Sequence, residues 1–437
     1  MTNVVLVHTD DTGRYIGPYG RSVETPALQG LADEGVLFRN AHCATPTCSP
    51  SRGALLTGSS PHSNGLVGLA HRGFEMDDYG RHLAGYLSRQ GVETVLAGQQ
   101  HEADPEGTTR EAAASDLLGY DRVLEGDASA VDPSIDHDRT RMDLASADAA
   151  AAYLREADDP FFLSLGLWNT HKPVPLDQHT VNPAHVRPPS PLPDAPAVRE
   201  EIAAFHVLVR YADECVDRVV RALRDAGRLE DTLVVFTTDH GPPFPGMKGE
   251  LTEGGTGIAL VVRLPEGEDA RRGVAEDSLV SNVDLFPTIC ESLGVPVPAW
   301  VEGTSLLGLC RGEADAVREA VFGETNYHGS YYPARCVRTE RYRYVRRFEL
   351  DQHGRDTVDA GPSASFLDEH GCQGGPPPEE ALYDYYCDAG GETNRADDPE
   401  YADVRAKLAA RLDDWMERTD DPLLDGRVPA PEGADPE

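Results

Sequence analysis

Polar residues with catalytic potential stand directly after several apolar segments of the sequence. In open α/β sheets, ligands bind beyond the carboxyl ends of the strands, so residues in these positions are the first candidates for a functional site. The residues that follow the runs NVVLVHT, VETVLAGQQ, PFFLSLGLWNT and DTLVVFTT are Asp10 and Asp11, His101, His171, and Asp239 and His240.

The acidic residues of this set offer ligands for a hard metal ion. Carboxylate oxygens such as those of Asp10, Asp11 and Asp239 suit calcium or magnesium. A single Asp-Asp pair is more often a turn or a helix cap, but acids at two strand ends of one sheet favour a cation site. Imidazole is a softer ligand than oxygen, so His240 is either a ligand or a neighbour of one.

The segment TPTCSPSRGALLTG contains a further candidate, Cys48. A thiol phosphatase of the Cys-x5-Arg type needs arginine six residues after its cysteine, whereas Ser49 and Ala54 stand six residues after Cys43 and Cys48. A zinc site at the two cysteines lacks a second pair of ligands at suitable spacing. A buried apolar cysteine remains an alternative, although Arg52 four residues later does not suit it.

The pattern of apolar residues predicts the elements that position these groups. Strand-like and helix-like segments alternate over the first three hundred residues, from NVVLVHTDD to DTLVVFTTDHG. Thr25 as N-cap, Pro26 at the first helical position and Gly35 as a stop predict a helix in TPALQGLADEG. Further helices are expected in YGRHLAGYLSRQG and FHVLVRYADECVDRVVRALRDAG. The fold class is therefore α/β, with a mostly parallel central sheet sandwiched by helices.

The pattern changes after residue 315. ARCVRTERYRYVRRFEL predicts two antiparallel strands, and EYADVRAKLAARLDDWMERT predicts a closing amphipathic helix. We expect a large domain at residues 1–315 and a small α+β domain at 316–437. Prolines in residues 182–198 predict an irregular surface loop, and glycine, proline and acidic residues in 351–380 predict a second long loop.

The charge of the chain is strongly acidic, with a formal net charge of −36. Its 39 basic residues include only three lysines, Lys172, Lys248 and Lys407. Such a surface suits a cytoplasm of molar salt, where the Debye length is about 3 Å and self-repulsion is screened. We interpret the chain as halophilic, with an ordinary acidic protein as the alternative. The charge argues against nucleic acid and anionic membranes as partners.

The start of the sequence and its cysteines bear on the cellular compartment. MTNVVLVHTDD leads directly into a strand pattern without a basic n-region, and no apolar run approaches 18 residues. The eight cysteines are scattered, which favours reduced thiols over a disulfide framework. These observations predict a cytoplasmic protein.

The segment that begins at Cys48 resembles a known family signature. CSPSRGALLTG resembles the sulfatase signature C-x-P-x-R-x4-T-G at every fixed position. PHSNGL, DTLVVFTTDHGPPFP and ALYDYYCDAGGETN are similar to segments of the N-sulfoglucosamine sulfohydrolase (heparan N-sulfatase) branch of that family. The resemblance covers nearly the whole chain and implies an alkaline-phosphatase-like fold with a small C-terminal four-stranded sheet.

The resemblance implies a modified cysteine and one metal ion. Cys48 would be oxidised by a formylglycine-generating enzyme to 3-oxoalanine (formylglycine), whose hydrate is a geminal diol. One hydroxyl would attack sulfur, and the other would then expel sulfate. One divalent cation, most typically Ca²⁺, would be held by Asp10, Asp11, Cys48, Asp239 and His240.

The resemblance also implies roles around the sulfate. Arg52 would anchor the diol and Lys248 would bind the sulfate through a charge-assisted contact, where the alternative is a solvated loop lysine. His171 would be the general acid for the leaving group, and His101 would contact the sulfate or the diol.

Two positions depart from the family pattern. Gln99 stands where the family has lysine in G-K-x-H, and Asn169 stands where the branch has an acidic residue before its histidine. A hydrogen bond would replace an ion pair at Gln99, so sulfate binding would weaken or substrate choice would change. Discrimination between N-sulfate and O-sulfate would be relaxed.

These features favour a metal- and formylglycine-dependent sulfatase acting on a small sulfated saccharide. Two alternatives stay open. A phosphomonoester, phosphodiester or phosphonate hydrolase could use the same scaffold, and a non-catalytic binding protein could retain an unmodified Cys48. The second is disfavoured because a binding protein does not need the whole set of acids, histidines, Arg52 and Lys248.

Overall fold

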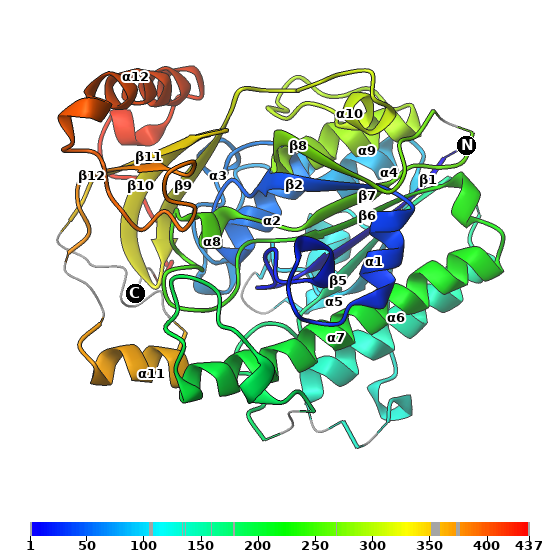
Figure 1. The fold of residues 1–437 in the computed structure, drawn as a ribbon. Coiled ribbons are helices and arrows are strands. Elements are labelled where there is room, and N and C mark those ends of the chain that lie inside the picture. The colour runs from blue at the N-terminus through cyan, green and yellow to red at the C-terminus, as the bar shows by residue number, and fades with distance from the viewer. Residues whose placement is uncertain are drawn as a thin grey trace.

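The structure is a computed structural model that describes residues 2–435 except 105–107, 133, 136, 159, 178–179, 268, 351–358 and 373–375. Its centre is an eight-stranded sheet in the order β4-β3-β5-β1-β6-β7-β2-β8 (Figure 1). The strands are β1 Asn3–Thr9, β2 Val36–His42, β3 Glu93–Gly98, β4 Arg122–Leu124, β5 Phe161–Leu167, β6 Thr232–Thr238, β7 Leu260–Arg263 and β8 Val274–Ser281. β7 runs antiparallel to both of its neighbours, β6 and β2, and the other pairs are parallel. The predicted mostly parallel sheet is confirmed.

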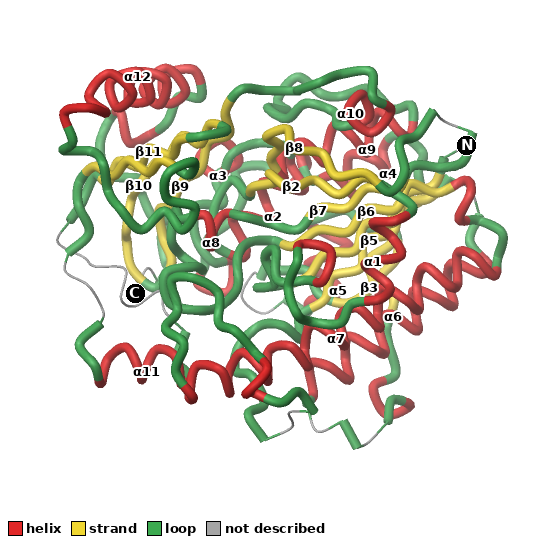
Figure 2. The backbone as a smooth tube through the Cα atoms, in the orientation of Figure 1, coloured by secondary structure: helices red, strands yellow, loops and turns green. Residues whose placement is uncertain are grey.

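Helices cover both faces of this sheet because its inner strands are apolar on both sides (Figure 2). In β1, Val5 and Val7 belong to one core cluster, while Val4 and Leu6 belong to the other. The first face carries α1 Pro26–Asp33, α6 Asp138–Glu156 and α7 Pro196–Asp225. The second face carries α2 Cys48–Thr57, α4 Leu83–Arg89, α9 Leu285–Leu293 and α10 Leu307–Arg311.

A second sheet of four antiparallel strands lies beside the first, in the order β12-β11-β10-β9. Its strands are β9 Ala320–His328, β10 Ser330–Thr339, β11 Tyr342–Arg347 and β12 Glu380–Asp384. α12 Ala402–Arg418 covers it, with Leu412 and Trp415 packed in one cluster with Val337 and Tyr344. The predicted strand pair and closing helix are confirmed, and the domain boundary at residue 315 stays a prediction.

Some local predictions differ from the structure. Thr25 precedes α1, but its hydroxyl accepts a hydrogen bond from the N–H of Gly17 at 2.9 Å instead of capping the helix. The expected loop at 182–198 contains a short 3-10 helix, Pro183–His185, and ends where Pro196 starts α7, because proline needs no hydrogen-bond partner in a first helical turn. The expected loop at 351–380 contains α11 Pro362–Glu369, and part of it lies outside the described residues.

The expectations on cysteines and membranes concern the molecule as a whole. All eight cysteines are free, six buried and two exposed. Within the described part of the chain, no helix is both long and apolar enough to span a bilayer.

Candidate active site

Neighbouring strands of the large sheet bring the predicted residues to one edge. β3, β5, β1 and β6 are adjacent and parallel, so their carboxyl ends deliver His101, His171, Asp10 and Asp239 to the same region. The chain turns sharply after β1, where Asp11 has a left-handed φ of 50°. Its N–H donates to Asp239 Oδ1 at 3.0 Å, and this bond fixes the turn. Such a backbone conformation is uncommon outside glycine and often accompanies a functional site.

The buried helix α2 places Cys48 at the same edge. Cys48 is its first residue, and all ten residues of the helix are buried. Asn282 holds the helix through its side-chain N–H, which donates to the carbonyl of Ser51 at 3.0 Å. The helix ends at Gly58 with φ 70°, where a Cβ atom would lie 2.9 Å from Phe286. The glycine that ends the signature is therefore required by both the turn and the packing.

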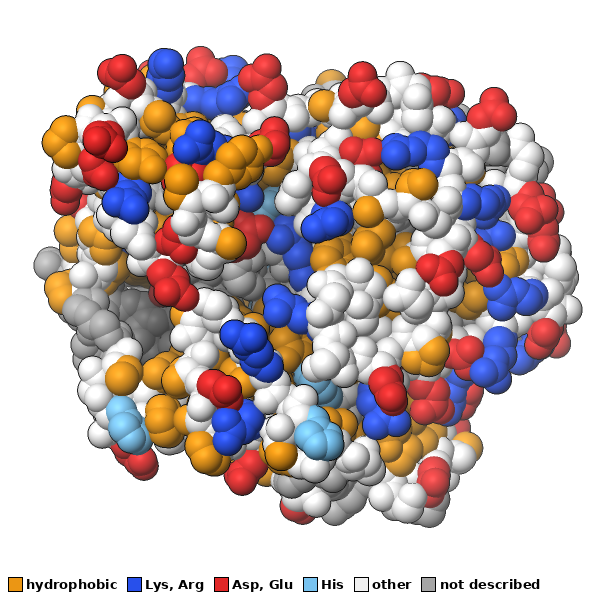
Figure 3. All heavy atoms as spheres, in the orientation of Figure 1, with side chains coloured by type: hydrophobic (Ala, Val, Ile, Leu, Met, Phe, Trp, Pro, Cys, Tyr) orange, Lys and Arg blue, Asp and Glu red, His pale blue; other side chains and the backbone are white. Residues whose placement is uncertain are grey.

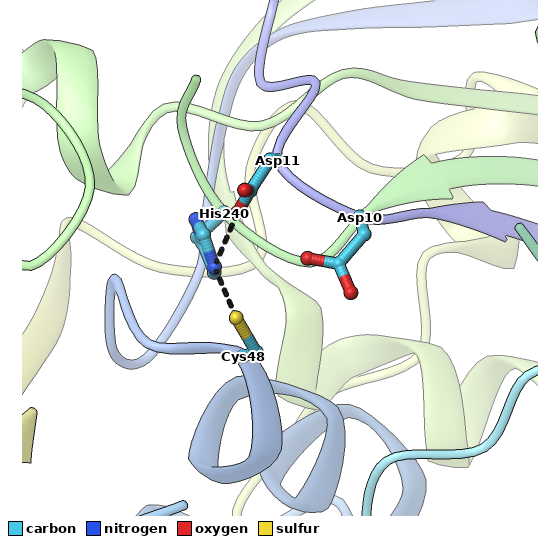
Figure 4. A group of neighbouring side chains, drawn as sticks. All are labelled: Asp10, Asp11, Cys48 and His240. Carbon is cyan, nitrogen blue, oxygen red and sulfur yellow. Dashed lines mark hydrogen bonds and ion pairs between the residues drawn. The ribbon is translucent and has the colours of Figure 1, made fainter. Parts of the chain in front are cut away.

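Four of the predicted metal ligands lie together. Asp10, Asp11, Cys48 and His240 each offer one ligand atom, and these atoms are within 4.8 Å of one another (Figure 4). His240 Nε2 is 3.2 Å from Cys48 Sγ and 3.3 Å from Asp11 Oδ1. The other ring nitrogen, Nδ1, is 2.9 Å from the carbonyl of Gly241. If Nδ1 donates its proton there, Nε2 presents a lone pair to the cluster.

The carboxylates of this cluster lack protein partners for part of their oxygens. Asp10 Oδ1 and Asp11 Oδ1 are buried without a hydrogen bond. Burial raises the pKa of Asp11 well above its usual value. Burial also acts on Asp10, but the charges of Arg52 and nearby groups outweigh it and lower the pKa of Asp10. Unpartnered buried oxygens facing a neutral imidazole are a donor set that fits a hard divalent cation.

The fifth predicted ligand, Asp239, borders the group of four. Its Oδ1 accepts hydrogen bonds from the N–H groups of Asp11 and His240, and its Oδ2 is 3.7 Å from His240 Nε2. Arg52 lies between two of the acids, 3.3 Å from both Asp10 Oδ2 and Asp239 Oδ2. Arg52 is 1% exposed, so it neutralises charge in the interior of the site.

The remaining predicted residues surround the same cluster. Lys248 Nζ is 2.9 Å from Asp11 Oδ2 and 3.2 Å from His171 Nε2. His101 Nδ1 is 3.9 Å from Asp10 Oδ2, and its ring stacks on that of His71 with centroids 5.6 Å apart. Burial lowers the pKa of His101 to about 3, and burial together with Lys248 lowers the pKa of His171.

The two departures from the family pattern occupy different surroundings. Gln99 is half-buried at the end of β3, two residues before His101. Asn169 is fully buried and its side-chain N–H donates to the carbonyl of Leu208 at 2.7 Å, which ties the end of β5 to α7. The side-chain amide of Asn169 therefore has a structural role in this protein, where the branch has an acidic residue.

Two residues near the site escaped the sequence analysis. Arg139 donates from Nη1 to the carbonyls of His171 at 2.9 Å and Lys172 at 2.6 Å, which fixes the loop that carries His171. Asp359 Oδ2 lies 3.2 Å from Lys248 Nζ. Arg139 starts an ordinary helix and Asp359 lies in a segment without periodicity, so no pattern in the sequence marks either.

Comparison with known proteins identifies the family. The sulfatase family profile matches residues 2–295, and that of the N-sulphoglucosamine sulphohydrolase C-terminal region matches residues 249–360. The chain belongs to the sulfatase family, whose enzymes hydrolyse sulfate esters or sulfamates. It is 31% identical to human N-sulphoglucosamine sulphohydrolase over 485 aligned residues, which cover 99% of this chain and 92% of the human protein.

Other relatives agree with this assignment. An ulvan-active sulfatase of Formosa agariphila is 27% identical, with 98% of this chain and 82% of that protein covered. Among solved structures, a 2-O GAG sulfatase superposes with a TM-score of 0.75 at 23% identity, covering 99% of this chain and 96% of that one. The phosphonate monoester hydrolase of Agrobacterium radiobacter superposes with a TM-score of 0.73 at 20% identity, covering 96% of both chains. These superpositions establish the alkaline-phosphatase-like fold.

Proposed function

We propose that this sulfatase hydrolyses a sulfate ester or an N-sulfate of a small sulfated sugar, through formylglycine made from Cys48 and one divalent cation. The observation that carries the proposal is the position of Cys48. It begins a buried helix, lies within 4.8 Å of three other ligand groups, and opens a complete sulfatase signature. A formylglycine-generating enzyme is the partner that this modification requires.

One Ca²⁺ ion is the proposed metal, with Asp10, Asp11, Asp239, His240 and the modified Cys48 as its ligands. Three carboxylates suit calcium better than a soft metal. When bound, the ion supplies Lewis-acid polarisation of sulfate oxygens, and the hydrated aldehyde supplies a hydroxyl nucleophile.

Four side chains of the site are assigned to bind the sulfate, to balance the charge of the acids and to protonate the leaving group. Lys248 carries the positive charge that a sulfate oxygen needs, and Arg52 balances the acids behind it. His171 Nε2 faces Lys248 at 3.2 Å, beside the place where a leaving group would depart, and is assigned as the general acid. His101 lies near Asp10 and is assigned a contact with the sulfate or the nucleophile.

The substrate class rests on the relatives. Their names include N-sulphoglucosamine, ulvan and hexuronate sulfatases, all of which act on sulfated saccharides. We assign a sulfated mono- or short oligosaccharide to this chain, because its net charge of −36 disfavours a long polyanion. The phosphonate monoester hydrolase on the same fold makes phosphoryl-ester hydrolysis the second candidate.

A substrate panel tests the proposal. We expect kcat/KM to be higher for N-sulfoglucosamine or an O-sulfated hexosamine than for an aryl phosphate, with an aryl sulfate as a reference. An aryl phosphate preferred by about tenfold, equivalent to 1.4 kcal/mol of transition-state stabilisation, would favour the phosphohydrolase instead.

A further inference from the structure

Asp359 lies at the edge of the candidate active site. Its Oδ2 is 3.2 Å from Lys248 Nζ, and the same Nζ is 3.2 Å from His171 Nε2. Asp359 and His171 therefore contact the same ammonium group, that of Lys248. The Asp359 side chain is 29% exposed, and its Oδ2 atom is buried beside Lys248.

A buried anchor holds the backbone of Asp359 in this place. Lys172, which is 4% exposed, is 2.9 Å from Glu201 Oε1 and donates to the carbonyl of Asp359 at 3.4 Å. Glu201 also accepts hydrogen bonds from the N–H and the hydroxyl of Ser363, at the start of α11. A Cβ atom at Gly361 would lie 2.2 Å from Glu201 Oε1, so only glycine lets the chain pass this close. Because this anchor is buried and contacts the backbone at positions 359 and 363, it fixes Asp359 beside Lys248.

A carboxylate beside the leaving group affects N–S and O–S cleavage differently. In a sulfamate the S–N bond breaks with its electron pair left on nitrogen, the sulfuryl group passes to an attacking oxygen, and nitrogen takes a proton. Reaction with one water gives an ammonium ion and a sulfate ion. Protonated nitrogen carries positive charge, whereas the oxygen leaving from an ester develops negative charge. A nearby carboxylate stabilises the first and opposes the second.

We propose that Asp359 is a specificity-determining residue that favours N-sulfated amino sugars over O-sulfated sugars. This inference rests on the proposed function, which does not distinguish N-sulfated from O-sulfated sugars. In the free protein Asp359 pairs with Lys248. With substrate bound, Lys248 contacts the sulfate, and Asp359 accepts a hydrogen bond from the nitrogen that His171 protonates. Lys172 and Glu201 are positioning residues for Asp359.

Kinetics on three variants test this role. Asp359→Asn removes the charge at constant shape, Asp359→Glu keeps it, and Asp368→Asn removes a charge from the exposed side of α11 as a matched control. We expect Asp359→Asn to lower the ratio of kcat/KM for N-sulfoglucosamine to that for glucosamine 6-O-sulfate by about tenfold or more, which is 1.4 kcal/mol. Asp359→Glu should restore part of the ratio, and Asp368→Asn should leave it unchanged. An unchanged ratio in Asp359→Asn overturns the proposal.

A binding measurement decides the same point without turnover. Calorimetry in saturating inorganic sulfate, which takes the contact with Lys248, compares glucosamine, an ammonium at pH 6.5, with uncharged N-acetylglucosamine and needs no formylglycine. We expect Asp359→Asn to weaken glucosamine binding and to leave N-acetylglucosamine binding unchanged. Equal effects on both sugars overturn the role of Asp359. Failure of the wild-type protein to hydrolyse any sulfated sugar would contradict the proposed function, while calorimetry would still decide the role of Asp359.

Discussion

Individual residues at this site combine burial with unbalanced charge. Asp10, Asp11 and Asp239 are all at most 1% exposed, while Arg52 and Lys248 supply the nearby cationic charge. Isolated buried carboxylates are costly, so such a group persists where a bound cation or a function compensates for it.

Removal of one acid should therefore release the metal. We expect Asp10→Ala to reduce the divalent cation content from one ion per chain to none, because the four remaining proposed ligands cannot replace the lost charged oxygen. Elemental analysis after gel filtration measures the content. The surface substitution Asp277→Asn is the control and should keep the ion. Two zinc ions per chain in the wild type would instead indicate a phosphatase-type site.

The placement of the candidate-site residues was the most predictable part of the molecule. Asp10, His101, His171 and Asp239 follow apolar strands, and parallel strands bring such ends together whatever the loops between them do. Asp359 was not predictable in this way, because its position depends on Lys172 and Glu201, which the chain brings together only through tertiary packing.

The glycine that ends α2, Gly58, stabilises the way this helix packs. Gly58→Ala places a Cβ atom 2.9 Å from Phe286 at a φ of 70°, so strain and overpacking add. We expect a loss of about 2 to 4 kcal/mol in the free energy of unfolding, measured by urea denaturation. Gly294→Ala separates the two causes, because Gly294 has a φ of 68° with open space around it. An equal loss in the two variants would contradict the packing argument.

Packing between distant elements is where sequence patterns carry least information. The antiparallel strand β7 reads as another apolar run, and direction cannot be inferred from composition. α11 lies in a segment expected to be a loop. It forms a helix because Glu201 on α7 accepts a hydrogen bond at its start and because Phe366 packs against the large core. Tertiary contacts override weak local preference in such cases.

A buried ion pair joins the short helix α3 Pro61–Asn64 to the second sheet and makes stability depend on pH. His62, on α3, contacts Glu324 on β9, and both side chains are at most 1% exposed. Burial alone would lower the pKa of His62, but the Glu324 carboxylate outweighs it and raises the pKa. The stabilisation is therefore complete below about pH 6.5 and is lost as pH rises through the raised pKa of the folded state.

The His62→Gln substitution tests this dependence. Wild-type unfolding free energy should fall above pH 6.5, by up to about 1.4 kcal/mol for each unit by which the pKa is raised. The glutamine variant should be less stable at pH 6 and should lack this component of the fall. The measurement is urea denaturation between pH 5.5 and 9. This range starts about one unit below the ordinary histidine pKa and extends well above it. Identical slopes in both proteins would show that His62 does not titrate with folding.

The molecule as a whole carries far more acidic than basic side chains. Figure 3 shows acidic groups spread over the visible face, from the region of α12 to that of α6 and α7. Many basic groups are already paired, but surface pairs contribute little each. Self-repulsion of a net charge of −36 should dominate the response to salt.

Stability should therefore rise with ionic strength. We expect Tm to increase steeply from low salt to molar KCl, where the Debye length is about 3 Å, and a neutral reference protein in the same series to change little. Differential scanning calorimetry measures both. A Tm that does not change between low and molar salt would refute the halophilic interpretation and favour the alternative, an ordinary acidic protein.

The mass of the Cys48 peptide tests the central claim most directly. The protein should be purified from its own host, digested, and compared with the same preparation of Cys48→Ala, which should fold normally and show no sulfatase activity. The account predicts 3-oxoalanine or its hydrate at position 48, with sulfatase activity in proportion to the modified fraction. An intact, alkylatable thiol in all of the protein, together with full activity, would contradict it.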